Sequence, residues 1–270
     1  MQPDLLSPLF DYSVVDGLGR ARQRGLVPRL DAKIFRTQAV GPAVELAGLE
    51  AGIDLKSLGK CNWLDQGSLQ PLLNALTTRS RQWLAPDGRR GLVTGAGLEL
   101  EEILTSFKID AHKAALAAGF EKAALLVAAM GEIIGNVVDH SEATDSGMAM
   151  FSAEAGRFEF VIADAGIGAL QSLTRNPDHK GIGDEGTALQ AMVETGVSRF
   201  AGDTGHGNGF RPIFEKLADM TGQLRFRSGD YALTLDGRFG DRIARQVSQK
   251  PKFTGLLAAV CCSAPRYRRT

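Results

Sequence analysis

The segment Phe120–His140, FEKAALLVAAMGEIIGNVVDH, has the clearest pattern in this chain of 270 residues. At about 100° per residue its apolar side chains form one stripe of a helix, and its polar side chains fall on a narrow arc beside that stripe. Glu132 and Asn136 lie one turn apart on this arc, near Asp139 and His140. The sequence therefore predicts a helix that packs against a core and carries an acid and an amide beside the packed side.

The polar arc has two interpretations. It is compatible with a solvent-facing side, because amphipathic surface helices are common. Such a side usually carries Lys and Arg, however, and neither occurs from Ala123 to Val138. Mg²⁺ prefers hard oxygen ligands such as the amide of Asn136, and a carboxylate one turn away, at Glu132, can orient and deprotonate an attacking group. Both residues are therefore candidate site residues.

The segments around this helix predict an α+β protein. A second helix is expected at Leu98–Ala118, ended by Gly119, and alternating apolar residues predict strands at Ser146–Ala153 and Arg157–Ala163. Further helices are expected at Glu185–Gly196 and about Phe210–Met220, with strands at Gly222–Ser228, Tyr231–Leu235 and Phe253–Cys262. This order indicates a sandwich in which one mixed β-sheet has helices on one face.

Two glycine-rich turns follow predicted elements. Asp164-Ala165-Gly166-Ile167-Gly168 comes after a strand; Asp164 can accept a hydrogen bond from an exocyclic amine, and its glycines let a flat ring approach the backbone. Gly205-His206-Gly207-Asn208-Gly209-Phe210 precedes a helix, where exposed N–H groups and the helix N-terminus suit an anion. Taken singly, the first is also typical of an ordinary strand-to-helix turn and the second of a flexible loop.

Together, the helix and the two turns resemble the GHKL superfamily of Bergerat-fold ATPases, which includes histidine kinases, DNA gyrase and the bacterial anti-sigma-factor serine kinases. Glu132-Ile133-Ile134-Gly135-Asn136 resembles the N-box of that superfamily, the turn at Asp164 its G1 box and the turn at Gly205 its G2 box. The resemblance covers about Leu98 to Ser263, including Phe253-Thr254-Gly255-Leu256, where the superfamily often has its closing strand. It implies a Bergerat-type sandwich of a mixed sheet with helices on one face.

The resemblance also implies ATP and Mg²⁺ as ligands and a role for each matched position. Asn136 would coordinate Mg²⁺, Glu132 would be the general base, and Asp164 would bind the adenine amine. The segment from about Leu173 to Thr204 would form a lid over the nucleotide. The glycines expected to contact the nucleotide are Gly166 and Gly168 beneath the base and Gly205, Gly207 and Gly209 at the phosphates.

Within the superfamily the layout is most similar to the anti-sigma-type serine kinases, since Lys113–Ala123 connects a single helix to the N-box helix. Histidine kinases need a phosphoacceptor histidine well upstream, whereas His112 lies close to the N-box. The resemblance implies an ATP-dependent serine/threonine protein kinase or slow ATPase in a partner-switching or signalling system. The alternative is a non-catalytic, ATP-gated protein-interaction module. A STAS-type antagonist or a sigma-like regulator is the expected partner, and a homodimer is compatible with the resemblance.

Residues 1–95 are expected to form a smaller α/β domain, followed by the ATP-binding domain at 96–264 and a basic tail at 265–270. A strand is predicted at Ala51–Leu58, a helix at Gln66–Trp83 and a turn at Ala85-Pro86-Asp87-Gly88. Ile53-Asp54-Leu55 and Trp63–Leu69 resemble a STAS domain, with Gly67 where such domains carry a phosphorylated serine and Ser68 next to it. An unrelated α/β cap over the leucine stripe is the equally open alternative.

Composition sets outer limits on function. The 31 basic residues balance the 31 acidic ones, so overall charge gives no reason to expect nucleic acid as a partner. Three cysteines without histidines at zinc-ligand spacing indicate free thiols in a reducing compartment. Neither a signal peptide nor a sufficiently long apolar run is visible in the sequence, so a cytoplasmic protein without a membrane span is expected.

Overall fold

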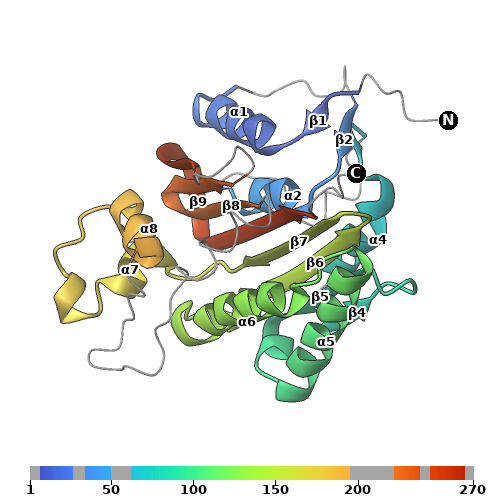
Figure 1. The fold of residues 1–270 in the computed structure, drawn as a ribbon. Helices are drawn as coiled ribbons and strands as arrows, with labels where there is room; N and C mark the ends of the chain where they lie inside the picture. Colours follow the sequence, from blue (N-terminus) through green and yellow to red (C-terminus); the bar gives the residue numbers. More distant parts are fainter. Residues whose placement is uncertain are drawn as a thin grey trace, which may run out of the picture.

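The computed structural model describes residues 7–26, 34–49, 62–78, 80–194, 222–237 and 244–264. Its centre is a six-stranded sheet in the order β4-β5-β6-β7-β9-β8 (Figure 1). The strands are β4 (Gln82–Leu84), β5 (Arg90–Thr94), β6 (Met148–Glu154), β7 (Arg157–Ala163), β8 (Gln223–Asp236) and β9 (Ala244–Ser263). Each neighbouring pair is antiparallel, so the expectation of a mixed sheet is wrong. Four of the five pairs join strands that are consecutive in the chain, and short turns such as those between β4 and β5 and between β6 and β7 allow only antiparallel pairing.

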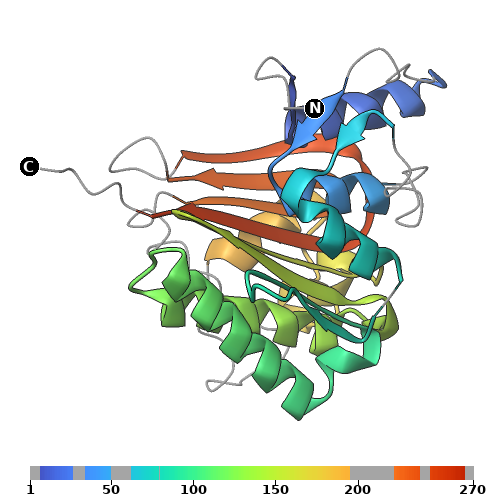
Figure 2. The ribbon, with the colours of Figure 1, turned by 90° about the vertical axis from the view of Figure 1, so that its right-hand side faces the viewer.

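Two long helices cover one face of this sheet, α5 (Glu101–Ala117) and α6 (Ala123–His140). Both predicted helices are confirmed, and each begins three residues later than its apolar pattern does. They lie side by side beneath the sheet (Figure 2). The core between them and the sheet contains the rings of Phe107, Phe151 and Phe158, with 5.4 Å between the centroids of Phe107 and Phe151.

The apolar character of α6 has a second interpretation. Its 18 residues have a mean hydropathy of 1.3, so by length and composition α6 could cross a membrane. In the fold, 39% of this window is buried, and Met130, Ile133 and Ile134 have no exposed surface. The core helix of a soluble protein has the same composition, so these properties alone do not decide between the two.

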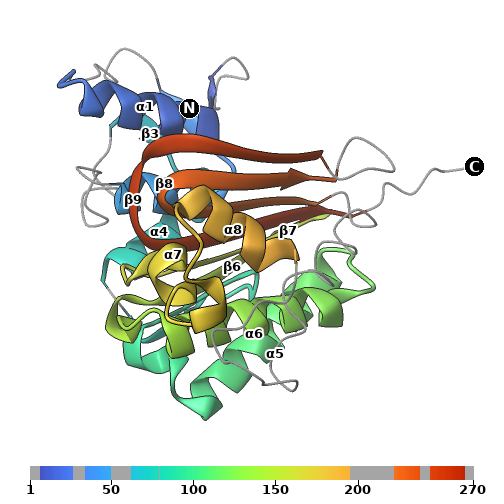
Figure 3. The same cartoon turned by 90° about the vertical axis from the view of Figure 1, so that its left-hand side faces the viewer.

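A helical segment follows β7 and contains α7 (Gly168–Leu173), the 3₁₀ turn η4 (Pro177–His179) and α8 (Glu185–Glu194). Helix α8 begins where the sequence predicts it and packs on β8 (Figure 3). The helix expected at about Phe210–Met220 lies outside the described residues.

The N-terminal region is an α/β layer on the opposite face of the large sheet (Figures 1 and 2). Its small sheet is parallel, in the order β1-β2-β3. Its elements are β1 (Leu9–Phe10), α1 (Tyr12–Gln23), β2 (Phe35–Thr37), α2 (Val40–Gly48), β3 (Leu64–Asp65), η1 (Gly67–Leu69) and α4 (Gln70–Thr77). The expectation of a smaller α/β unit before the main sheet is therefore confirmed at this level. The strand expected at Ala51–Leu58 lies outside the described residues.

Helices thus cover both faces of the large sheet, and the expectation of helices on one face is wrong. Strand β7 shows the cause, because its two faces are both apolar. Phe158, Phe160 and Ile162 pack on the side of α5 and α6, whereas Val161 and Ala163 pack on the side of the N-terminal layer. A strand buried on both faces requires a layer on each side.

Two boundaries differ from the expected ones. The helix predicted for Gln66–Trp83 ends at Thr77, and Trp83 already belongs to β4, which forms a hairpin with β5 around the turn predicted at Ala85–Gly88. The six-stranded sheet therefore includes strands that precede residue 96. Strand β8 continues through both strands predicted between 222 and 235, with a register irregularity at Gly229.

Candidate functional site

The first candidate site is the turn that leaves β7. Asp164 is 5% exposed, and its Oδ1 accepts a hydrogen bond of 2.7 Å from the Gly166 N–H. Its own N–H donates to the carbonyl oxygen of Leu256 in β9, at 2.9 Å. Burial raises the pKa of Asp164 to about 6, although hydrogen bonds from the backbone of Gly166 and Leu256 act in the opposite direction. The turn therefore holds a buried carboxylate whose negative charge is only partly compensated by the protein.

Two glycines let this turn approach its neighbours closely. A Cβ added at Gly166 would lie 2.0 Å from the carbonyl oxygen of Ser141, the residue that follows α6. A Cβ added at Gly255 in β9 would lie 2.1 Å from the carbonyl oxygen of Asp164. The Ile167 N–H also donates to the Ser141 carbonyl, at 3.0 Å. The end of α6, the turn after β7 and the middle of β9 therefore meet at Asp164.

The first turn of α7 follows directly. Gly168 has a φ of +75°, in the left-handed region that favours glycine. The next two N–H groups are already bonded: Ala169 donates to Ser228 Oγ at 2.9 Å, and Leu170 donates to Glu185 Oε2 at 3.1 Å. These two amides are therefore not available to a phosphate group, and any such contact must come from another segment.

The polar arc of α6 precedes this meeting point in the chain. Glu132 is exposed and Asn136 is half-buried, and within the described residues neither side chain has a hydrogen-bond partner. With a rise of 1.5 Å per residue, Asn136 is about 8 Å and Glu132 about 14 Å from Ser141 along the helix axis. Glu132 and Asn136 therefore precede the turn of Asp164 at two successive levels of the helix.

The structure brings together some of the residues expected in the site. Asp164, Gly166 and Gly168 form one turn, and this turn touches the end of the helix that carries Glu132 and Asn136. The expected phosphate-binding glycines, Gly205, Gly207 and Gly209, lie outside the described residues. Sequence analysis did not identify Ser141 or Glu185 as neighbours of this turn, since no local pattern marks them.

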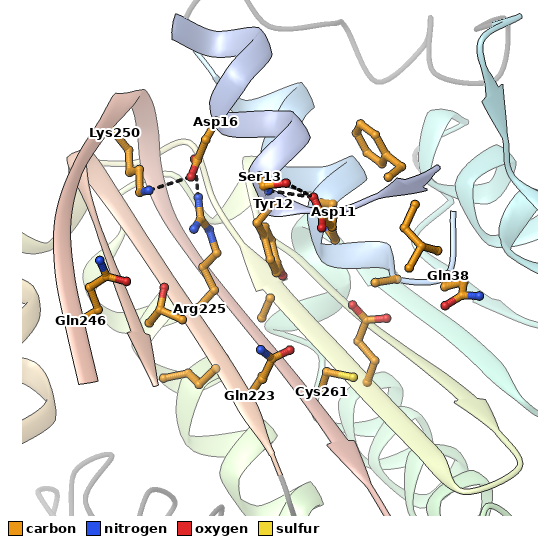
Figure 4. Close-up of a pocket in the computed structure, with 18 of the residues that line it drawn as sticks. Asp11, Tyr12, Ser13, Asp16, Gln38, Gln223, Arg225, Gln246, Lys250 and Cys261 are labelled. Carbon is orange, nitrogen blue, oxygen red and sulfur yellow. Dashed lines mark hydrogen bonds and ion pairs between the residues drawn. The ribbon is translucent and has the colours of Figure 1, made fainter. Parts of the chain in front are cut away.

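A second candidate site is a cavity of about 580 Å³ on the other side of the large sheet, between the N-terminal layer and strands β7, β8 and β9 (Figure 4). Its wall combines polar residues with an apolar part formed by Leu9, Phe10, Pro42, Leu224 and Ala259. The polar lining residues are Asp11, Tyr12, Ser13, Asp16, Gln38, Arg157, Glu159, Gln223, Arg225, Thr234, Gln246, Ser248, Lys250, Cys261 and Ser263. They come from segments far apart in the sequence, so no local motif predicted that they would form one cavity.

A buried ionic cluster closes one end of this cavity. Arg225 Nε lies 2.6 Å from Glu45 Oε2, and Arg225 Nη2 lies 2.7 Å from Asp16 Oδ1. Lys250 Nζ is 2.7 Å from Asp16 Oδ2, and Arg227 Nε is 2.8 Å from Glu45 Oε1. Burial alone would lower the pKa of Arg225, but Glu45 and Asp16 raise it above its ordinary value. Helices α1 and α2 are therefore fixed to β8 and β9 by paired charges.

A second pair lies at the other end. Glu159 accepts hydrogen bonds of 2.9 Å from the N–H groups of Val40 and Gly41, in the first turn of α2, and it pairs with Arg157 Nη2 at 3.3 Å. Burial raises the pKa of Glu159, whereas Arg157 and the two amides act in the opposite direction. A carboxylate at a helix N-terminus is stabilised by the helix dipole. Arg157 Nε also donates to Cys261 Sγ at 3.1 Å.

Metal ligands do not cluster in the part of the chain that the structure describes: no three His, Cys, Asp or Glu side chains there are placed to hold an ion. In comparisons with protein-family models, with curated proteins and with solved structures, no match to this chain was found. The GHKL resemblance therefore depends on the motifs in the sequence and on the geometry around Asp164.

Proposed function

We propose that the protein binds ATP with Mg²⁺ at the meeting point of α6 and the turn after β7, and that it acts as a serine/threonine protein kinase or slow ATPase in a regulatory system. The observation that carries this proposal is Asp164: a nearly inaccessible carboxylate at the end of a central strand, held in place by glycine contacts on both sides. A buried acceptor of this kind is costly unless a donor pairs with it.

The adenine amine is a donor suited to this carboxylate. Asp164 Oδ1 is occupied by the Gly166 N–H, and no protein side chain among the described residues donates to the carboxylate. An exocyclic amine would complete its hydrogen bonding and would favour the ionised form over the protonated one. The glycines at 166 and 168 let the turn lie against Ser141 and Ser228, and these contacts hold the Asp164 carboxylate in position for the base.

The phosphates of the nucleotide would be bound by α6 and by a glycine-rich segment. Asn136 offers an amide oxygen that has no partner among the described residues, and Glu132 offers an exposed carboxylate about 6 Å further along the axis. Mg²⁺ held by Asn136 and the phosphates would neutralise charge during transfer. Glu132 would accept the proton of the attacking hydroxyl or water. The first amides of α7 are occupied by protein acceptors, and the GHKL resemblance implies Gly205, Gly207 and Gly209 as the phosphate donors.

A second candidate function is an ATP-gated interaction module without transfer. It is favoured by the position of β9, which touches both parts of the molecule. Gly255 contacts Asp164, while two residues earlier Phe253 bridges to Leu49 of the N-terminal layer. A conformational change in the turn at Asp164 would therefore be transmitted through β9 to the N-terminal layer on the other face of the sheet.

Binding is tested by calorimetric titration of the full chain with ATP in the presence of Mg²⁺. We expect wild type to bind and Asp164→Asn to bind at least tenfold more weakly, because the amide presents a donor to the adenine amine. Asp110→Asn, which removes a half-buried carboxylate on α5, is the matched control and should leave the affinity unchanged. If wild type fails to bind ATP, or if Asp164→Asn binds as tightly as wild type, the assignment is wrong.

Turnover is tested separately by following the γ-phosphate of labelled ATP. Glu132→Gln should retain ATP affinity and lose most of the hydrolysis or transfer, since it removes only the base. If wild type binds ATP but shows no turnover, and an ATP-dependent partner interaction persists in Glu132→Gln, the protein is an ATP-gated interaction module and the kinase assignment is wrong.

A further inference from the structure

The cavity between α1 and strands β8 and β9 is independent of the nucleotide turn and has its own chemistry. It lies on the opposite face of the large sheet, and its volume of about 580 Å³ is in the range of small-molecule sites. The class of ligand that fits this cavity is restricted by three properties of its lining: the charges, the free hydrogen-bonding groups and the apolar surface.

The charges that line the cavity are compensated within the protein. Arg225 and Lys250 pair with Asp16, and Arg157 pairs with Glu159. Asp11 caps the N-terminus of α1 by accepting from the N–H groups of its first turn. Apart from Asp11, whose partners are N–H groups and Ser13 Oγ, the charged side chains of this lining already pair with opposite charges. A ligand with a net charge would therefore lose its hydration with little compensation.

The free groups are neutral. Among the described residues, five lining side chains have no hydrogen-bond partner: Tyr12, Gln38, Thr234, Gln246 and Ser248. Each is a hydroxyl or an amide, so each can both donate and accept. Ligand hydroxyl groups have the same dual capacity, so a hydroxyl-rich molecule matches them in either direction.

Tyr12 is the best-defined of these groups. It projects from the first turn of α1 toward the sheet (Figure 4), and the guanidinium carbon of Arg225 lies 4.6 Å from its ring centroid. Burial and the neighbouring carboxylates of Glu159 and Glu45 raise its pKa well above the ordinary value, so the hydroxyl keeps its proton. It is therefore a fixed hydrogen-bond donor at the cavity wall.

We propose that this cavity binds a small, uncharged, polyhydroxylated molecule of the size of a sugar or cyclitol. The hydroxyl groups of such a ligand would bond to Tyr12 and to the amides and hydroxyls of β8 and β9. Its C–H surface would pack on the apolar part of the wall formed by Leu9, Phe10 and Pro42. The charged pairs at both ends would stay as they are.

The proposal is tested by ligand-observed NMR and calorimetry on the full chain with D-glucose, D-galactose, D-ribose and myo-inositol. L-Glutamate and L-lysine, of similar size but charged, are the comparison probes. We expect at least one of the four uncharged probes to bind and neither charged probe to compete with it. Absence of binding by all four, or tighter binding of a charged probe, would overturn the proposal.

Matched variants locate the binding. Tyr12→Phe removes one hydroxyl and should weaken binding about tenfold. Gln246→Ala should weaken it as well, whereas Gln249→Ala, on the opposite face of the same strand, should not. ATP affinity should be unchanged in all three, which separates this site from the nucleotide turn. If the probes bind wild type and these lining variants equally, they bind elsewhere and the cavity assignment is wrong.

Discussion

Gly255 and Asp164 pack so closely that no side chain fits between them: a Cβ at Gly255 would lie 2.1 Å from the Asp164 carbonyl oxygen and 2.7 Å from its carbonyl carbon. Both of these neighbours are backbone atoms, which cannot rotate away. Gly255 also has a φ of +79°. This contact, together with the hydrogen bond between Asp164 N–H and the Leu256 carbonyl, fixes the turn after β7 on β9.

Gly255→Ala should therefore destabilise the protein by about 3 kcal/mol or more, from backbone clash and left-handed strain together. Gly156→Ala is the matched control: Gly156 has a φ of +74°, but a Cβ there would meet no atom within 4 Å. Strain alone should cost that variant about 1 kcal/mol. Urea denaturation measures both values. Equal losses in the two variants would show that the close contact with Asp164 contributes nothing.

Asp164 should also make stability depend on pH. Its pKa is raised from 3.8 to about 6 in the folded protein, so the native state binds its proton more tightly than the unfolded chain does. The free energy of unfolding should therefore fall as pH rises through this window, by about 3 kcal/mol for this group. Asp164→Asn should be more stable than wild type at neutral pH, by an amount that declines toward pH 4.

Denaturation curves measured across that pH range test this dependence. The pKa of Glu159 is also raised, so Glu159 contributes to the pH dependence of the wild-type stability. The contribution of Asp164 is therefore the difference in stability between wild type and Asp164→Asn. A difference that stays constant with pH would contradict the raised pKa.

Local pattern was sufficient for the elements with long, regular periodicity. Helix α6 and strand β7 have the predicted character because each alternates or repeats over at least seven residues. Strands β4 and β5 were missed because they are three and five residues long and because Gln82 and Arg90 interrupt their apolar pattern. The turn between them was nevertheless predicted, since Pro86 and Gly88 act locally.

Contacts between distant segments were not accessible from the sequence. Arg225 and Glu45 are 180 residues apart and pair only because the N-terminal layer covers β8 and β9. Glu45 lies in a predominantly apolar helix, VGPAVELAG, where a single acid gives no indication of its partner. The segments that resemble the GHKL boxes could be picked out because that superfamily has its motifs in a fixed order, whereas no such order marks the residues of the cavity.

The hydroxyl of Tyr12 lies so close to Gly41 that a side chain at position 41 should destabilise the protein. A Cβ at Gly41 would lie 2.1 Å from Tyr12 Oη and 3.0 Å from the Ala259 Cβ. Gly41→Ala should therefore destabilise wild type by about 1–3 kcal/mol through overpacking. In the Tyr12→Phe background the same change should cost clearly less, because the clashing atom is gone and alanine favours the helix. A double-mutant cycle by urea denaturation measures the coupling, and strict additivity would contradict it.

Glu45→Gln should be among the most damaging single substitutions in the chain. Glu45 is fully buried and pairs with both Arg225 and Arg227, so its loss would leave Arg225 with Asp16 alone and the buried Arg227 with backbone carbonyl partners only. Breaking a buried ion pair from one side typically costs about 3–5 kcal/mol. Asp110→Asn is the control, since it removes a half-buried carboxylate that lies 4.0 Å from the exposed ammonium of Lys113 and should cost less than about 1 kcal/mol. Chemical denaturation gives both numbers; similar small losses would mean that the cluster does not fix the N-terminal layer to the sheet.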